Sequence, residues 1–230
     1  MCQSNAQTPI RRAQPTNYLR GFSSPSSDFY INMFGFAALV ASGASCPDYR
    51  DIQQPSVRQG AFHPAELDGA WYLVATTEPT LPPFCKCGVN VFQVHVESMT
   101  YNYVNTDRCI VNVSVPIKGV LSNDTSTPGL LHENFGPWNS THGLPLLPNM
   151  VFHVRRNASL KVDVALSYAC LGRILGTERF SFNVLTRTDR LERGQIEALV
   201  ATANASTGGM LEMDGLRYSD EAAYQQCGML

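Results

Sequence analysis

Cysteine is the residue type in this sequence with the most evident chemistry. The seven cysteines are Cys2, Cys46, Cys85, Cys87, Cys109, Cys170 and Cys227, and the six from Cys46 onward form an even number. Such a set is typical of disulfide bonds made in an oxidising compartment. A reduced protein with scattered buried thiols is the alternative. A metal or redox site at Cys85-Lys-Cys87 is disfavoured, because no second C-x-x-C motif and no nearby histidine pair accompanies it.

N-linked glycosylation is the second chemistry that the residues suggest. Five asparagines stand in N-x-S/T sequons, namely Asn112, Asn123, Asn139, Asn157 and Asn204. Sequons and an even set of cysteines together predict a glycoprotein that is secreted or lies in an organelle lumen of the secretory pathway.

Catalytic patterns are missing from the sequence. The five histidines show neither metal nor nucleophile spacing; they are His63, His95, His132, His142 and His153. Ser159 and Ser167 lack an adjacent base motif, and no phosphate-binding glycine loop, H-E-x-x-H or G-x-S-x-G occurs. We therefore predict no enzyme, no catalytic residue, no metal and no cofactor.

The charge of the chain argues against nucleic acid as a partner. The 230 residues carry a net charge of −2 and contain no run of Lys and Arg that could neutralise phosphates. A peripheral membrane or receptor contact and the oligomeric state stay open.

The N-terminal part of the chain reads as a leader rather than as part of the fold. Residues 1–32 are polar and aperiodic, which predicts a disordered segment or a wrongly assigned start. Residues 33–45 hold a short apolar run followed by small residues, as in a signal peptide cleaved shortly before Cys46. A longer targeting segment, a lipid-modified Cys46 and a buried helix are the alternatives. Residues 46–61 predict an extended lead-in because of their prolines.

Strands are the elements that must position the remaining residues. Apolar residues alternate with polar ones or cluster with β-branched and aromatic types in eight stretches. These are 71–77, 91–97, 100–104, 109–117, a short strand at 129–132 inside a long polar loop, 150–155, 160–170 and 177–186. The spacing then becomes helical over Leu191–Ala203, with Asp189 at the N-cap position.

The order of eight strands and one helix, together with three motifs, resembles the lipocalins. Leu67-Asp-Gly-Ala-Trp-Tyr-Leu contains the family's G-x-W at Gly69 and Trp71. Val164–Cys170 is similar to the seventh strand of apolipoprotein D and of retinol-binding lipocalins, and Asn183-Val-Leu-Thr-Arg187 to the last strand. The resemblance covers about residues 62–227 and implies a lipocalin domain over residues 62–230. It implies an all-β fold: an eight-stranded antiparallel up-and-down barrel with one C-terminal helix packed outside.

The resemblance also implies contacts at the barrel floor and a disulfide pattern. Arg187 would lie over Trp71 at the closed end, where Gly69 lets the chain enter tightly. Cys46 would pair with Cys170, Cys85 or Cys87 with Cys227, and the remaining one of those two with Cys109.

Strand parity predicts which side chains line the barrel. If Trp71 points inward, Leu73 and Ala75 do so too, and Asn183 and Leu185 share the inner face with Arg187. The hairpins add apolar and aromatic side chains at Phe92, Val94, Tyr101 and Tyr103. Such a largely apolar cavity predicts binding or transport of a small hydrophobic ligand: a lipid, retinoid, sterol or carotenoid.

Two other functions stay open. Residues 69–85 and the helix-then-cysteine ending also resemble the lipocalin domain of violaxanthin de-epoxidases, which are carotenoid enzymes. However, Leu81-Pro-Pro-Phe-Cys-Lys holds no carboxylate that could act as a general acid. The third function is a glycosylated protein-interaction module that binds through loop 121–149 and whose barrel is filled by its own side chains.

Overall fold

The computed structural model describes residues 47–77, 85, 87–109, 112–134, 147–174, 177–188, 191–211 and 213–219. The predictions for residues 1–45, for Cys46, Asn139 and Cys227, and for residues 81–84 and 86 therefore fall outside the described part of the chain. Among the described residues, no helix is long and apolar enough to cross a membrane.

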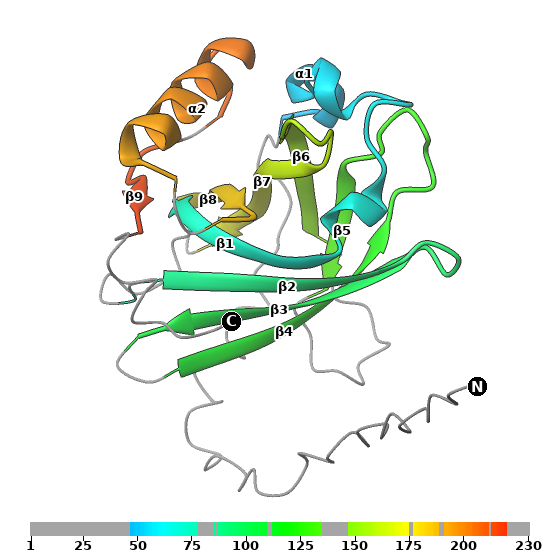
Figure 1. The fold of residues 1–230 in the computed structure, drawn as a ribbon, viewed down its shortest axis with the longest axis horizontal. Coiled ribbons are helices and arrows are strands. Elements are labelled where there is room, and N and C mark those ends of the chain that lie inside the picture. The colour runs from blue at the N-terminus through cyan, green and yellow to red at the C-terminus, as the bar shows by residue number, and fades with distance from the viewer. Residues whose placement is uncertain are drawn as a thin grey trace, which may run out of the picture. The chain divides into compact units, whose positions relative to one another are not determined.

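Eight antiparallel strands form a closed barrel (Figure 1). They are β1 (Gly69–Thr76), β2 (Cys87–His95), β3 (Thr100–Arg108), β4 (Asn112–Leu121), β5 (Leu130–Asn134), β6 (Leu147–Arg156), β7 (Val162–Ile174) and β8 (Thr177–Thr186). Each strand pairs with the next along the chain, and β1 pairs with both β2 and β8, which closes the sheet. The predicted eight-stranded up-and-down barrel is confirmed.

Side chains of alternating type give each strand one inner and one outer face. On β3, the side chains of Tyr101 and Tyr103 point inward and are buried. Val104, the residue after Tyr103, points outward and is 38% exposed. The inner side chains of the barrel make one apolar cluster that includes Trp71, Phe92 and Leu185. A second apolar cluster lies on the outer face, where Phe182 and Val184 of β8 pack with the C-terminal helix.

A β-bulge interrupts the alternation in β1. Leu73 pairs with Leu185 and Ala75 with Val184, so two steps on β1 oppose one on β8. The backbone carbonyls of Leu73 and Val74 accept hydrogen bonds from the Ser219 side chain and backbone N–H at 2.7 and 2.9 Å. Ser219 directly follows the short strand β9 (Arg217–Tyr218), which pairs with β1 and which the sequence did not predict.

The predicted C-terminal helix is confirmed as α2 (Arg193–Ser206), outside the barrel (Figure 1). Ile196 and Ala203 on its apolar face are buried. Asp189 is not its N-cap. That position is Glu192, whose backbone N–H donates to the Gln195 side chain at 3.2 Å.

The lead-in is folded, so the prediction of an extended segment is wrong. It forms α1 (Tyr49–Ile52) and the 3-10 turn η3 (Pro55–Val57), and a second 3-10 turn, η4 (Pro64–Leu67), follows it. Asp48 caps α1 by accepting a hydrogen bond from Arg50 N–H. The prolines stand at the first turns of η3 and η4, where a missing N–H costs no helical hydrogen bond.

One disulfide bond joins Cys85 to Cys109, so the cysteine of the first loop that reaches Cys109 is Cys85. Cys87 and Cys170 are disulfide-bonded as well. Their predicted partners, Cys227 and Cys46, lie outside the described residues.

Candidate ligand-binding site in the barrel

The end of the barrel at which β1 begins, called the floor below, is closed by Trp71. Its ring is fully buried and its Nε1–H donates to the Leu67 carbonyl at 2.7 Å. The Arg187 guanidinium lies over the ring, 3.8 Å from its centroid, and donates to the carbonyls of Glu66, Asp68 and Ala70. The two residues that the family resemblance paired are thus in contact.

Gly69 is needed for this close approach. Its φ is +95°, a conformation that other residues rarely adopt, and a Cβ there would lie 3.1 Å from the Arg187 side chain.

Most of the predicted cavity residues lie inside the barrel, near the floor, and pack against one another. Leu73, Phe92, Tyr101, Tyr103 and Leu185 are all buried members of the inner cluster, and Val94 packs against it half-buried. The rings of Phe92 and Tyr103 stack with centroids 4.6 Å apart, and Tyr101 is nearly parallel to Tyr103. These side chains therefore fill much of the lower half themselves.

Ala75 does not share this inner face, because the bulge in β1 reverses the parity that the sequence suggested. Ala75 belongs to the outer cluster together with Val184. Thr76 faces inward in its place, and its hydroxyl donates to the Asn183 side chain at 2.6 Å. Asn183 is thus inside as predicted from parity, and it also exchanges hydrogen bonds with Ser181.

The half of the barrel away from Trp71, called the distal half below, is lined by polar side chains that the sequence analysis missed. Inner positions there are occupied by Asn105 and Asp107 on β3, Glu133 on β5 and Asn149 on β6; Asn90 on β2, also at an inner position, stands between Trp71 and Asn105 in the sheet register. All of these except Asn105 are at least 91% buried. The signal was present, because Asn105 and Asp107 continue the parity of Tyr101 and Tyr103.

The two carboxylates orient two of the asparagines. The Nδ2 of Asn105 donates to Asp107 at 2.8 Å, and the Nδ2 of Asn149 donates to Glu133 at 2.5 Å. The Oδ1 atoms of Asn105 and Asn149 are buried and have no hydrogen-bond partner among the described residues. The same holds for Oδ1 of Asn90 and the hydroxyl of Tyr101.

Tyr101 reaches from the aromatic stack toward Glu133. Its ring lies over Gly119, where a Cβ would fall 2.3 Å from the ring, so only glycine fits. Burial, helped by the negative charge of Glu133, raises the pKa of Tyr101 well above its ordinary value. The hydroxyl is therefore protonated at neutral pH and can donate or accept a hydrogen bond.

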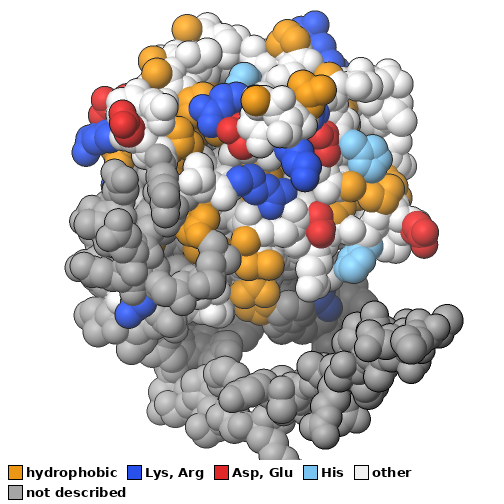
Figure 2. All heavy atoms as spheres, viewed as in Figure 1, with side chains coloured by type: hydrophobic (Ala, Val, Ile, Leu, Met, Phe, Trp, Pro, Cys, Tyr) orange, Lys and Arg blue, Asp and Glu red, His pale blue; other side chains and the backbone are white. Residues whose placement is uncertain are grey.

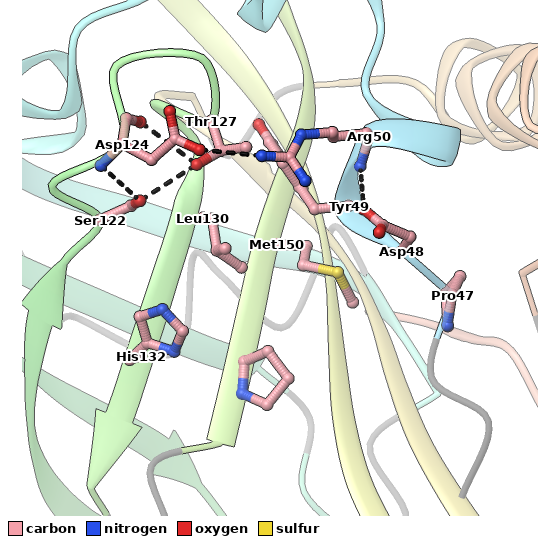
Figure 3. A pocket seen from close by; sticks show the side chains of 11 residues that line it. Pro47, Asp48, Tyr49, Arg50, Ser122, Asp124, Thr127, Leu130, His132 and Met150 are labelled. Carbon is pink, nitrogen blue, oxygen red and sulfur yellow. Dashed lines mark hydrogen bonds and ion pairs between the residues drawn. The ribbon is translucent and has the colours of Figure 1, made fainter.

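A separate pocket of about 330 Å³ lies on the outer wall, between the lead-in and strands β4–β6 (Figure 3). Its polar side chains bind one another: Arg50 pairs with Asp124 at 3.0 Å, and Ser122 is 3.0 Å from Thr127. Pro47, Leu130 and Met150 supply apolar walls. The pocket lies where the lead-in packs on the outer face of the sheet. None of the predicted ligand-binding residues lines it.

The surface carries the described glycosylation candidates. Asn123, Asn157 and Asn204 are exposed, so each could accept a glycan without unfolding. Acidic and basic side chains lie side by side on the face shown in Figure 2. Within the described ranges, no three His, Cys, Asp or Glu side chains cluster as metal ligands would.

Comparison with known proteins identifies the fold. No protein-family model and no curated protein matches the sequence. Insecticyanin from the tobacco hornworm Manduca sexta has a similar structure, with a TM-score of 0.52 and 16% identity over 76% of this chain and 85% of that one. Lobster apocrustacyanin A1 gives a TM-score of 0.48 and 15% identity over 68% and 78% of the two chains. The closed barrel, its outer helix and the likeness to insecticyanin together show that this chain has the lipocalin fold.

Proposed function

We propose that this protein binds and carries a small, largely apolar molecule inside its barrel. The observation that carries the proposal is a set of four buried polar atoms inside the barrel, on Asn90, Tyr101, Asn105 and Asn149, that have no hydrogen-bond partner among the described residues. Buried polar atoms in proteins are almost always satisfied, so a group other than the protein's own is expected to meet them. An eight-stranded barrel is wide enough to hold one such molecule.

The cell compartment belongs to the same proposal. The Cys85–Cys109 disulfide and the exposed sequon asparagines support a secreted or lumenal glycoprotein. The proposal is binding without catalysis: on the inner face beside Ser167, the side chains of Thr76, Ser181 and Asn183 hydrogen-bond one another. Among lipocalins, the motifs favour a divergent relative of apolipoprotein D.

A fluorescent apolar probe tests whether the barrel binds such a molecule. N-Phenyl-1-naphthylamine emits strongly only when it is shielded from water. We expect saturable emission with one probe per chain. The variant Ala169→Phe places a ring on the inner face, next to Asn149 and Ser181 in the sheet register. It should weaken binding about tenfold or more by occupying the site.

The matched control is Ala198→Phe, which adds the same ring to an exposed position of α2. It should bind the probe as the unaltered protein does. Equal binding by both variants, each with an unchanged melting temperature, would place the probe outside the barrel and contradict the proposal.

A further inference from the structure

We infer that the ligand carries a hydrogen-bond-donating head group, a hydroxyl or an amine, and that this head lies among Asn90, Asn105 and Asn149 inside the barrel. The inference rests on the proposed function and specifies the chemistry of its ligand.

The orientation of the two asparagines decides which of their atoms meets the ligand. The carboxyl oxygens of Asp107 and Glu133 each accept a hydrogen bond from the amide N–H of an asparagine, Asn105 and Asn149 respectively. The Oδ1 atoms of these two asparagines are left without a hydrogen-bond partner among the described residues. An amide oxygen accepts and never donates.

Two further atoms extend this acceptor surface. Asn90 stands opposite Asn105 in the β2–β3 register, and its Oδ1 is also without a partner among the described residues. The hydroxyl of Tyr101 lies nearest the floor and completes the set. Three of the four atoms are thus pure acceptors, contributed by strands on two sides of the barrel.

This surface discriminates between head groups. A hydroxyl or an amine supplies the N–H or O–H that the amide oxygens need. A ketone or an ester supplies only acceptors and would leave those oxygens unsatisfied. A carboxylate likewise supplies only acceptors and would leave the amide oxygens unsatisfied. Free fatty acids are therefore poor candidates.

Competition within one series of equal chain length tests the inference. The compounds 1-decanol, decylamine, 2-decanone and decanoate would each displace N-phenyl-1-naphthylamine from the full-length protein. We expect decanol or decylamine to bind about tenfold more tightly than 2-decanone, and decanoate to bind most weakly. The alcohol and amine arms show whether the donor is neutral or cationic.

Two variants connect the preference to the residues. Asn90→Leu removes one amide oxygen that has no partner and should reduce the ratio of alcohol to ketone affinity severalfold. Tyr101→Phe removes a hydroxyl that can donate to a ketone as well as accept from an alcohol, so it should weaken both compounds and keep the ratio. Asn102→Leu, on the outer face of β3 between Tyr101 and Tyr103, is the matched control and should keep the ratio.

The outcomes are separable. Equal affinity for decanol and 2-decanone, or tightest binding of decanoate, overturns the donor head group while the proposed binding stands. No displacement by any of the four compounds, in a barrel that does not bind the probe, overturns both. A preference that Asn90→Leu leaves unchanged, in a variant that melts like the unaltered protein, places the head elsewhere and overturns the assignment.

Discussion

At the scale of single residues, the contact between Arg187 and Trp71 closes the floor of the barrel. The guanidinium makes three hydrogen bonds to backbone carbonyls and covers the indole ring. Burial lowers the pKa of Arg187, so its charge depends on these partners. The arginine thus connects η4, β1 and the end of β8.

Replacing this arginine should destabilise the fold. Arg187→Ala removes the charge-assisted hydrogen bonds and the cation–π contact, which together are worth about 2–4 kcal/mol in the free energy of unfolding. Urea denaturation measures the change. Arg193→Ala is the control, because Arg193 makes an exposed cation–π contact with Tyr218 and an exposed ion pair with Glu197. It should cost under about 1 kcal/mol, and equal losses in both variants would contradict the account of the floor.

Two residues make stability depend on acid. Burial, with the charge of Arg155 adding to it, lowers the pKa of His153 from its ordinary value of 6.5. The hydrogen bond from Arg156 lowers the pKa of Glu66. In both cases the unfolded chain takes up a proton at a higher pH than the folded one.

The free energy of unfolding should therefore fall as the pH drops below about 6.5, first through His153 and then through Glu66. Urea titrations at a series of pH values measure this slope. Glu66→Gln should flatten the part below the ordinary pKa of a glutamate and leave the part near pH 6 unchanged. A slope of the opposite sign near pH 6 would contradict the buried, neutral state of His153.

At the scale of elements, strand alternation was readable from the sequence and its interruptions were not. The parity of Tyr101 and Tyr103 predicted their inner positions. The bulge at Leu73–Ala75 was not predictable from the local sequence. The carbonyls of Leu73 and Val74 accept hydrogen bonds from Ser219, which lies far along the chain. The lead-in was missed for a similar reason, since its helical turns are held by packing on the barrel.

One hydrogen bond shows how the lead-in is held. The hydroxyl of Tyr49 donates to the backbone carbonyl of Val151 on β6 at 2.8 Å and lies over Gly129. Tyr49→Phe removes this buried bond and should lower the free energy of unfolding by about 1–2 kcal/mol. Tyr218→Phe, at a half-buried position on β9, should change it by under about 0.5 kcal/mol. Thermal unfolding of both variants measures these changes. A Tyr49→Phe variant as stable as the unaltered protein would show that this hydrogen bond of the lead-in does not stabilise the barrel.

At the scale of the whole barrel, the fold was predictable and the chemistry of the interior was not. Eight alternating stretches and the motifs around Trp71 and Arg187 suffice for the barrel. The polar distal half forms only when closure brings β2 and β3 into one interior with β5 and β6, so that Asn105 and Asn149 line the same space. In the lower half, the apolar side chains that strand parity places inside pack against one another.

The Cys85–Cys109 disulfide belongs to this scale, because it ties the chain before β2 to the chain after β3. Replacing both cysteines by serine should lower the free energy of unfolding by about 2–3 kcal/mol, since the bridge restricts the unfolded chain. Urea denaturation under non-reducing conditions tests this. A double variant as stable as the parent would show that the β2–β3 hairpin holds these ends together alone.

Native mass spectrometry of the protein, expressed through a eukaryotic secretory pathway, tests whether the barrel retains a small, largely apolar ligand. Solvent extraction of the retained material would accompany it. We expect one small molecule per chain, lost on denaturation, with an apolar body and a hydroxyl or amine head. A protein that is empty, and stays empty after exposure to long-chain alcohols, amines, sterols, retinoids and carotenoids, would contradict it.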